Sequence, residues 1–191
     1  MVQGQPGQTT FRLDNQYEFN ISLDRLWLVA RAPQPSLAAF AEQFEHFASV
    51  CKHHLRIGEF SRVGLRHILT RKYESKELAS AAFLGFGLIR APQPCFGVTN
   101  RPIFPAYSLR WEDEGKGCLV NCRVEERKFQ LEVPFGWESE APTDKIEPMI
   151  TLDIDYYSMG RIGVDQMRFT DWIKQAVHIV RRDSSTFLER K

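Results

Sequence analysis

Residues 150–157, with the sequence ITLDIDYY, predict a β-strand that has two chemically different faces. Successive side chains of a strand point to opposite sides, so Leu152 and Ile154 share one face while Asp153 and Asp155 share the other. The apolar face suits a protein core. The two carboxylates lie about 6–7 Å apart along the strand. They require either cationic partners or a ligand.

An earlier stretch, residues 62–69 with the sequence RVGLRHIL, predicts a strand with the complementary charge. The same alternation puts Arg62 and Arg66 on one face and places His67 among the apolar residues of the other. If the two strands are neighbours, the arginines can form bidentate bonds with the aspartates. An Asp–Arg ladder inside the fold and a ligand-binding site are both consistent with this pattern.

A catalytic alternative uses the same carboxylates. Asp153 and Asp155 could form a two-carboxylate metal site, with Asp113 or Glu126 as a third ligand. His178 paired with Asp155 could act as an oriented base. A hydrolase of the serine or cysteine type lacks its nucleophile, because no serine stands in a G-x-S-x-G turn. The metal-dependent hydrolase or nuclease ranks below the other functional classes, because nothing in the spacing demands a third ligand beside the two aspartates.

The periodicity along the chain predicts an α+β fold: antiparallel sheets with helices packed on one face. The order of elements is β-β-α-β-α, followed after a proline-rich segment by β-β-β-β-α. Turns are expected at 114–117 and 125–127, a polar loop at 136–148, and a connection at 158–168. Strands are expected at 11–21, 26–30, 60–70, 106–112, 118–124, 128–134 and 150–157, and helices at 36–54, 76–86 and from about 170 onward.

The predicted helices have buried stripes with helical spacing. Ser36 is a favourable N-cap for the first helix, and Thr170 and Asp171 stand at the start of the last one. In the first helix the expected stripe is Leu37, Phe40, Phe44, Phe47 and Cys51, and in the last it is Trp172, Ala176, Ile179, Val180 and Phe187.

The domain organisation is predicted from a polar stretch at the N-terminus and a proline-rich segment near the middle of the chain. Residues 1–9 are polar and are expected to form a disordered tail. Residues 10–191 form one domain, with two loosely similar halves at 10–90 and 106–191. The segment 91–105 between them is rich in proline and is expected to join the halves.

Composition limits the classes of function. The 191 residues contain 25 Lys or Arg and 24 Asp or Glu, which gives a formal charge of +1 and no global attraction for nucleic acid or membrane. The sequence contains no phosphate-binding glycine motif, so no cofactor is expected. No signal peptide or membrane span is predicted. Buried free thiols in a reducing cytoplasm are expected for the four cysteines, Cys51, Cys95, Cys118 and Cys122.

Local basic clusters support a second class of function. A sheet face with basic and aromatic side chains could hold single-stranded nucleic acid through phosphate contacts and stacking. The overall neutrality and the lack of an RNP-like aromatic motif weaken this interpretation. The candidate residues are Arg62, Arg66, Arg71, Lys72, Arg181 and Arg182.

The order of the motifs resembles that of a sporadically distributed prokaryotic family of α+β proteins without assigned roles. The family motifs are an R-x-G-x-R strand, an L-D-I-D strand and a terminal helix with a His and a Phe. The matching positions here are 62–66, 152–155, His178 and Phe187. The match spans roughly residues 20–190.

The sequence departs from this family at two positions, with His67 in place of a Tyr and Leu69 in place of an Asn. It is also expected to be a short variant without the N-terminal segment of longer members. The resemblance implies a body without a cofactor and an association with mobile elements or antiphage defence.

The sequence thus favours a cytoplasmic protein that is not an enzyme and that works through protein–protein contacts. A protein partner or a homo-oligomer is expected, as a subunit of a larger assembly or defence-type system. The alternatives are a nucleic-acid-binding accessory protein that uses Arg62 and Arg66, and a metal-dependent hydrolase that uses Asp153 and Asp155.

Overall fold

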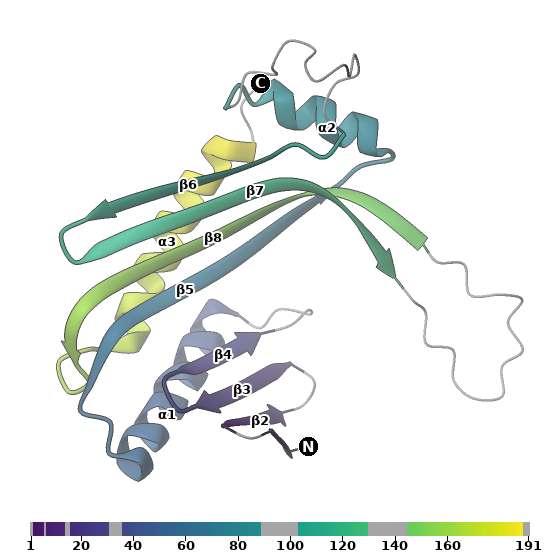
Figure 1. Ribbon diagram of the computed structural model, residues 1–191. Coiled ribbons are helices and arrows are strands. Elements are labelled where there is room, and N and C mark those ends of the chain that lie inside the picture. Colours follow the sequence, from purple (N-terminus) through teal and green to yellow (C-terminus); the bar gives the residue numbers. More distant parts are fainter. Residues whose placement is uncertain are drawn as a thin grey trace, which may run out of the picture. The chain divides into compact units, whose positions relative to one another are not determined.

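The computed structural model describes residues 2–5, 7–13, 16–30, 36–88, 103–129 and 145–188. The described residues form two antiparallel four-stranded sheets and three helices, which confirms the predicted α+β class (Figure 1). The chain divides into two compact units. Unit 1 comprises Met1–Val63 and Met159–Ile179, and unit 2 comprises Gly64–Ser158 and Val180–Lys191.

The division into units differs from the expected halves at 10–90 and 106–191. Each unit takes segments from both ends of the chain, and the boundaries fall after residues 63, 158 and 179. Three continuous elements therefore contribute residues to both units: β5 (Glu59–Lys72), β8 (Lys145–Gly163) and α3 (Phe169–Leu188). Most of the proline-rich segment 91–105 lies outside the described residues.

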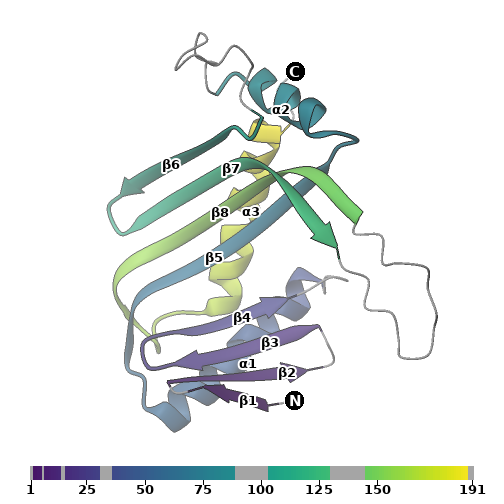
Figure 2. The same ribbon diagram turned by 45° about the vertical axis from the view of Figure 1, so that its right-hand side comes forward.

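Unit 1 contains the first sheet, a meander in the order β1-β2-β3-β4 (Figure 2). Its strands are β1 (Val2–Gln5), β2 (Gln8–Leu13), β3 (Tyr17–Ser22) and β4 (Leu26–Ala30).

Two expectations about this region are wrong. The disordered tail predicted for residues 1–9 contains β1 and the start of β2, which pair from Val2↔Phe11 to Gln5↔Gln8. Gly7, between these strands, has a φ of 81°, a left-handed conformation that is typical of a tight turn. The single strand predicted at 11–21 is divided into β2 and β3, and the Gln16 amide donates to the Leu13 carbonyl (3.1 Å) across the turn.

Helix α1 (Leu37–Leu55) also belongs to unit 1 and confirms the helix predicted at 36–54. The Ser36 side chain caps it by accepting a hydrogen bond from the Ala39 amide (3.1 Å). Phe47 packs edge-on against Phe19 of β3 with 5.1 Å between ring centroids. The buried residues of α1 are Ala41, Phe47, Ala48 and Cys51, so small residues fill positions between the predicted phenylalanines.

The second sheet has the order β5-β8-β7-β6, and its strands β6 (Ala106–Asp113) and β7 (Lys116–Phe129) lie wholly in unit 2. Strand β7 pairs antiparallel with both β6 and β8. Where the sequence predicted a turn at 125–127, β7 continues without interruption and Glu125 stands opposite Met149. Strand β8 also extends into the predicted loop at 136–148 and the predicted connection at 158–168. Cross-strand backbone pairing therefore continues through charged segments that resembled turns.

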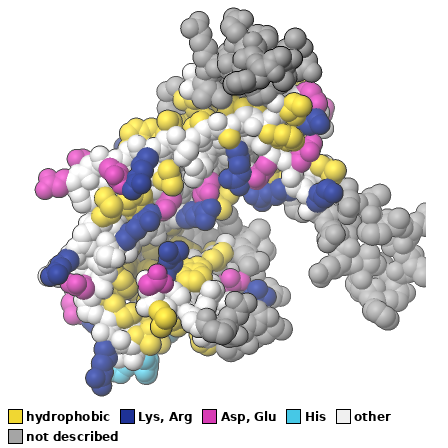
Figure 3. Space-filling model, in the orientation of Figure 1, with side chains coloured by type: hydrophobic (Ala, Val, Ile, Leu, Met, Phe, Trp, Pro, Cys, Tyr) yellow, Lys and Arg dark blue, Asp and Glu magenta, His cyan; other side chains and the backbone are white. Residues whose placement is uncertain are grey.

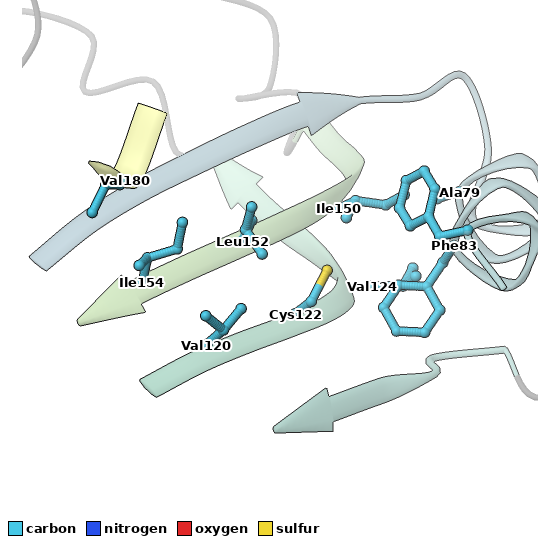
Figure 4. Close-up of a cluster of buried hydrophobic side chains, with 10 residues drawn as sticks. Ala79, Phe83, Val120, Cys122, Val124, Ile150, Leu152, Ile154 and Val180 are labelled. Carbon is cyan, nitrogen blue, oxygen red and sulfur yellow. The ribbon is translucent and has the colours of Figure 1, made fainter. Parts of the chain in front are cut away.

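The hydrophobic core of unit 2 lies against one face of this sheet (Figure 4). Leu152 and Ile154 of β8 are buried there, which confirms the apolar face predicted for residues 150–157. Helix α2 (Lys76–Gly85) contributes Phe83, and the C-terminal part of α3 contributes Val180. The other buried members of the cluster are Ala79, Phe86, Val120, Cys122, Val124 and Ile150.

Glycine at position 117 is required by a close contact. It stands opposite Tyr157 in the β7–β8 register, and the Tyr157 ring lies directly over it. A Cβ at this position would come within 2.6 Å of ring carbon Cζ of Tyr157. Tyr157 is buried, and its hydroxyl donates to the Glu112 carboxylate (3.0 Å), so the ring has little freedom to move.

We expect Gly117→Ala to destabilise the protein by about 1–3 kcal/mol, because the added methyl group overpacks against a held aromatic ring. Chemical denaturation monitored by circular dichroism gives the free energy of unfolding. Gly58→Ala is the control, since a Cβ at Gly58 meets nothing within 4 Å. Equal stabilities of the two variants would contradict the close-contact explanation.

Candidate functional site

The polar face of β8 lies on the side of the second sheet opposite the hydrophobic core. The register places Asp153 opposite Asn121 and Asp155 opposite Leu119. Directly opposed residues of an antiparallel pair share a face, so the sheet continues this polar surface onto β7 and β6. Asp153 is only 4% exposed. Its charge is therefore buried and depends on a partner within the protein.

Arg66 of β5 is that partner. Its Nε donates to Oδ1 of Asp153 (2.8 Å) and its Nη2 donates to Oδ2 (2.6 Å). This bidentate geometry is the strongest form of a carboxylate–guanidinium pair. The hydrogen bonds and charge of Asp153, aided by Asp155, raise the pKa of Arg66. The predicted Asp–Arg ladder is thus present for this pair.

Asp155 stands beside Gly64 of β5. A Cβ at Gly64 would lie 3.3 Å from Oδ1 of Asp155, so the glycine lets the carboxylate approach the backbone of the neighbouring strand closely. Arg62, the second predicted arginine, is exposed and belongs to unit 1. The pairing of Arg62 with Asp155 remains a prediction.

A second group centres on Glu125, which the sequence had assigned to a turn. Its carboxylate accepts hydrogen bonds from the Thr151 hydroxyl (2.6 Å), from Nε of Arg123 (2.7 Å) and from Nε of Arg127 (3.1 Å). Burial acts to raise the pKa of Glu125, but the hydrogen bond from Thr151 and the two arginines outweigh it, so the pKa lies below its ordinary value. The i, i+2 spacing of Arg123, Glu125 and Arg127 could have revealed this group, had it been assigned to a strand.

Two further pairs complete this surface. Lys72 lies 2.5 Å from Glu147, and Nε of Arg110 donates to Glu112 (2.9 Å). The hydrogen bonds from Arg110 and then Tyr157 lower the pKa of Glu112.

We call this surface the ion-pair face; basic and acidic side chains lie interspersed over it (Figure 3). By register and contact, the charged residues of this face in unit 2 whose side chains the structure describes are five basic ones, Arg66, Lys72, Arg110, Arg123 and Arg127, and five acidic ones, Glu112, Glu125, Glu147, Asp153 and Asp155. The formal charges of these ten residues balance.

The proposed third metal ligands do not join the aspartates. Glu126 and Asp113 fall on the opposite side of the sheet from Asp153, because their register positions share the parity of the core face. No group of three His, Cys, Asp or Glu residues that could hold a metal ion occurs within the described part of the chain. Both oxygens of Asp153 are also engaged by Arg66.

The histidines lie apart from the ion-pair face. His67 is half-buried on the other face of β5, where burial, and then the charge of Arg181, lower its pKa. This placement agrees with the core position predicted for His67. His178 is on the exposed side of α3 in unit 1, so its pairing with Asp155 of unit 2 remains a prediction.

The basic residues considered for nucleic acid are dispersed. Arg71 stacks over the Tyr73 ring at 5.7 Å and alternates in β5 with Lys72, so the two point to opposite faces. Arg182 pairs with Asp183 on α3. Arg66 and Lys72 are engaged on the ion-pair face. The described candidates of unit 2 therefore lie on both faces of β5 and on α3, and acidic partners engage Arg66, Lys72 and Arg182.

Three of the four cysteines are described, and all three are free thiols: Cys51, Cys118 and Cys122. Burial raises the pKa of each, and that of Cys122 reaches about 11, which opposes formation of a reactive thiolate. Cys95 lies outside the described residues. Among the described helices, none is long and apolar enough to cross a membrane.

Comparisons of the chain with family models, with curated proteins and with solved structures found no match. The resemblance to the prokaryotic family with R-x-G-x-R and L-D-I-D strands therefore remains a prediction. Inferences about function depend on the geometry of the chain itself.

We expect Arg66→Met to lower the free energy of unfolding by about 1–3 kcal/mol, because it leaves the buried Asp153 carboxylate without its cation. Arg182→Met is a matched control. The two arginine side chains are 65% and 64% exposed, but the side chain of Asp183 is 51% exposed whereas that of Asp153 is 6% exposed. Urea denaturation should show little loss for the control. Equal losses would show that burial of Asp153 does not determine the cost.

The Glu125 network predicts a pH dependence. Because folding lowers the pKa of Glu125 below 4.5, its ionised form stabilises the folded state above about pH 5, and that stability is lost as the pH falls through the folded pKa. In Glu125→Gln this contribution is absent, so the free energy of unfolding should fall less between pH 5 and pH 3 than in the parent. Denaturation curves across this range test the difference, and parallel pH profiles would contradict it.

Proposed function

We propose that this protein acts through protein–protein contacts and that strand β6 is its contact element. The strand lies at one end of the order β5-β8-β7-β6, so among the described strands only β7 pairs with it. An edge strand presents backbone donors and acceptors along one side, which another strand can pair with. Every side chain of β6 except that of Tyr107 is exposed.

The single observation that carries this proposal is the exposure of Leu109 and Trp111 on this edge. They are 37% and 48% exposed, although their register partners, Val120 and Cys118, pack in or against the core cluster of unit 2. Trp111 makes an edge contact with Phe187, with 6.4 Å between ring centroids. A strand added to β6 would extend both the backbone ladder and the apolar layer. Large aromatic side chains in this position are typical anchors of protein interfaces.

The charges of unit 2 favour protein contacts over phosphate binding. On the ion-pair face, acidic neighbours engage the guanidinium and ammonium groups, and the surface is electrically balanced. A nucleic-acid site requires a surplus of positive charge along one path. The nucleic-acid alternative therefore has less support, and the metal-dependent alternative lacks a third ligand near Asp153 within the described residues.

Cross-linking in the native host can test this proposal. A tagged chain is cross-linked at native expression and its attached proteins, further copies of itself included, are quantified by mass spectrometry. We expect Leu109→Lys/Trp111→Lys to lower specific cross-links by about tenfold or more, because two apolar anchors become charged.

Leu78→Lys provides the control, since Leu78 is a comparably exposed apolar residue on α2. It should leave the cross-links unchanged. If the double variant and the parent retain the same proteins in the same amounts, β6 is not the contact element.

A further inference from the structure

We infer that the partner of β6 is β6 of a second copy of this chain, paired antiparallel about a two-fold axis at Trp111. This inference rests on the proposed function, since it names the partner of the same strand. It is argued from the charges and side chains that β6 itself carries. An interface of this kind is isologous and closes at a dimer.

Charge complementarity fixes the register. In an antiparallel pair centred on Trp111, Arg110 of each copy stands opposite Glu112 of the other. Directly opposed residues have Cβ atoms about 4.5–5.5 Å apart, within reach of an ion pair. Symmetry produces this contact twice. A register centred one residue earlier would instead place Arg110 opposite its own copy, where like charges repel.

The two charges already lie on the same face of the strand. Arg110 and Glu112 are both exposed, and Nε of Arg110 donates to Oε1 of Glu112 (2.9 Å) within one chain. The Tyr157 hydroxyl donates to the same carboxylate (3.0 Å), which holds Glu112 over the end of the sheet. Dimerisation would exchange the two exposed in-strand pairs, one in each copy, for two cross-strand pairs of the same chemistry.

The apolar face of the strand completes the arrangement. In this register the two Trp111 rings meet at the axis, and Leu109 of each copy lies diagonally next to Trp111 of the other. Diagonal neighbours are about 7–8 Å apart, within reach of an aromatic ring. The two Trp111 rings and the two Leu109 side chains would form an apolar cluster that continues the layer formed by Val120 and Cys118. Aromatic pairs of this kind stabilise beyond the area they bury. The exposed Asp113 of each copy stands opposite Leu109 of the other and bounds this cluster at both ends.

The opposite edge of the sheet does not have this self-complementarity. Strand β5 carries a single acidic residue, Glu59, at its first position. The rest of its charged residues are basic: Arg62, Arg66, Arg71 and Lys72. Two copies of β5 would bring like charges together, a common protection of edge strands against self-pairing. Of the two edges of this sheet, β6 is therefore the one suited to a second copy.

Sedimentation equilibrium of the purified full chain tests the inference. We expect the parent to dimerise reversibly. Arg110→Glu should weaken the dimer by about tenfold or more, because it places two carboxylates opposite each other at both symmetric positions. The double variant Arg110→Glu/Glu112→Arg should restore dimerisation, since exchanging the charges recreates both pairs. Arg12→Glu, on the interior strand β2 of the other sheet, is the charge-reversal control and should dimerise like the parent.

Circular dichroism of each variant shows whether the fold is intact, and rescue by the double variant excludes misfolding as the cause of the loss. A monomeric parent at all concentrations, assembly larger than a dimer, or a dimer unaffected by Arg110→Glu would each overturn the inference. None of these outcomes removes the proposed function, because the cross-linking of Leu109→Lys/Trp111→Lys separately tests β6 against any protein partner. A monomeric parent whose cross-links are lost in that variant would show that β6 binds a different protein.

Discussion

The buried carboxylate of Asp153 is the constraint on which the second sheet depends. Its neighbours in β8, Leu152 and Ile154, face the core, and Asp153 itself is almost fully buried on the other side. A slip of one residue would turn the aspartate into the apolar core and expose the aliphatic residues. The charge also requires a cation at a fixed position on the adjacent strand, which Arg66 provides. The pair thus specifies both the register and the neighbour of β8.

The ion-pair face extends this role across the sheet, although its members differ in energetic weight. Exposed pairs such as Arg110–Glu112 contribute little to stability, because water screens them and their ordering costs entropy. The Glu125 carboxylate is more shielded and accepts three side-chain donors. Together these groups favour one alignment of strands over others, more than they increase stability.

The sequence was sufficient to predict what depends on local chemistry. The alternation around Asp153 and the cap at Ser36 act within a few residues, and the structure contains both. Of the predicted helical stripes, it buries Phe47 and Cys51 in α1 and Ala176 and Val180 in α3. The turn predicted at 125–127 failed because a run of charged residues resembles a loop, whereas Glu125 here is neutralised by Arg123 and Arg127 on the same strand face. In-strand pairs of this kind are visible only after the segment is known to be a strand.

The importance of β6 could not be predicted from local patterns, because it depends on strand order. The alternation of side chains along β6 places Leu109 and Trp111 on the core side of the sheet, where burial is expected. They become exposed because the order ends at β6, a property of how distant segments pair. The same order leaves β5 at the other end, where Arg62, Arg66, Arg71 and Lys72 discourage self-pairing. One edge is thus protected by like charges, and the other combines apolar side chains with charges of both signs, so a β6 contact extends the sheet without the repulsion that a β5 contact would meet.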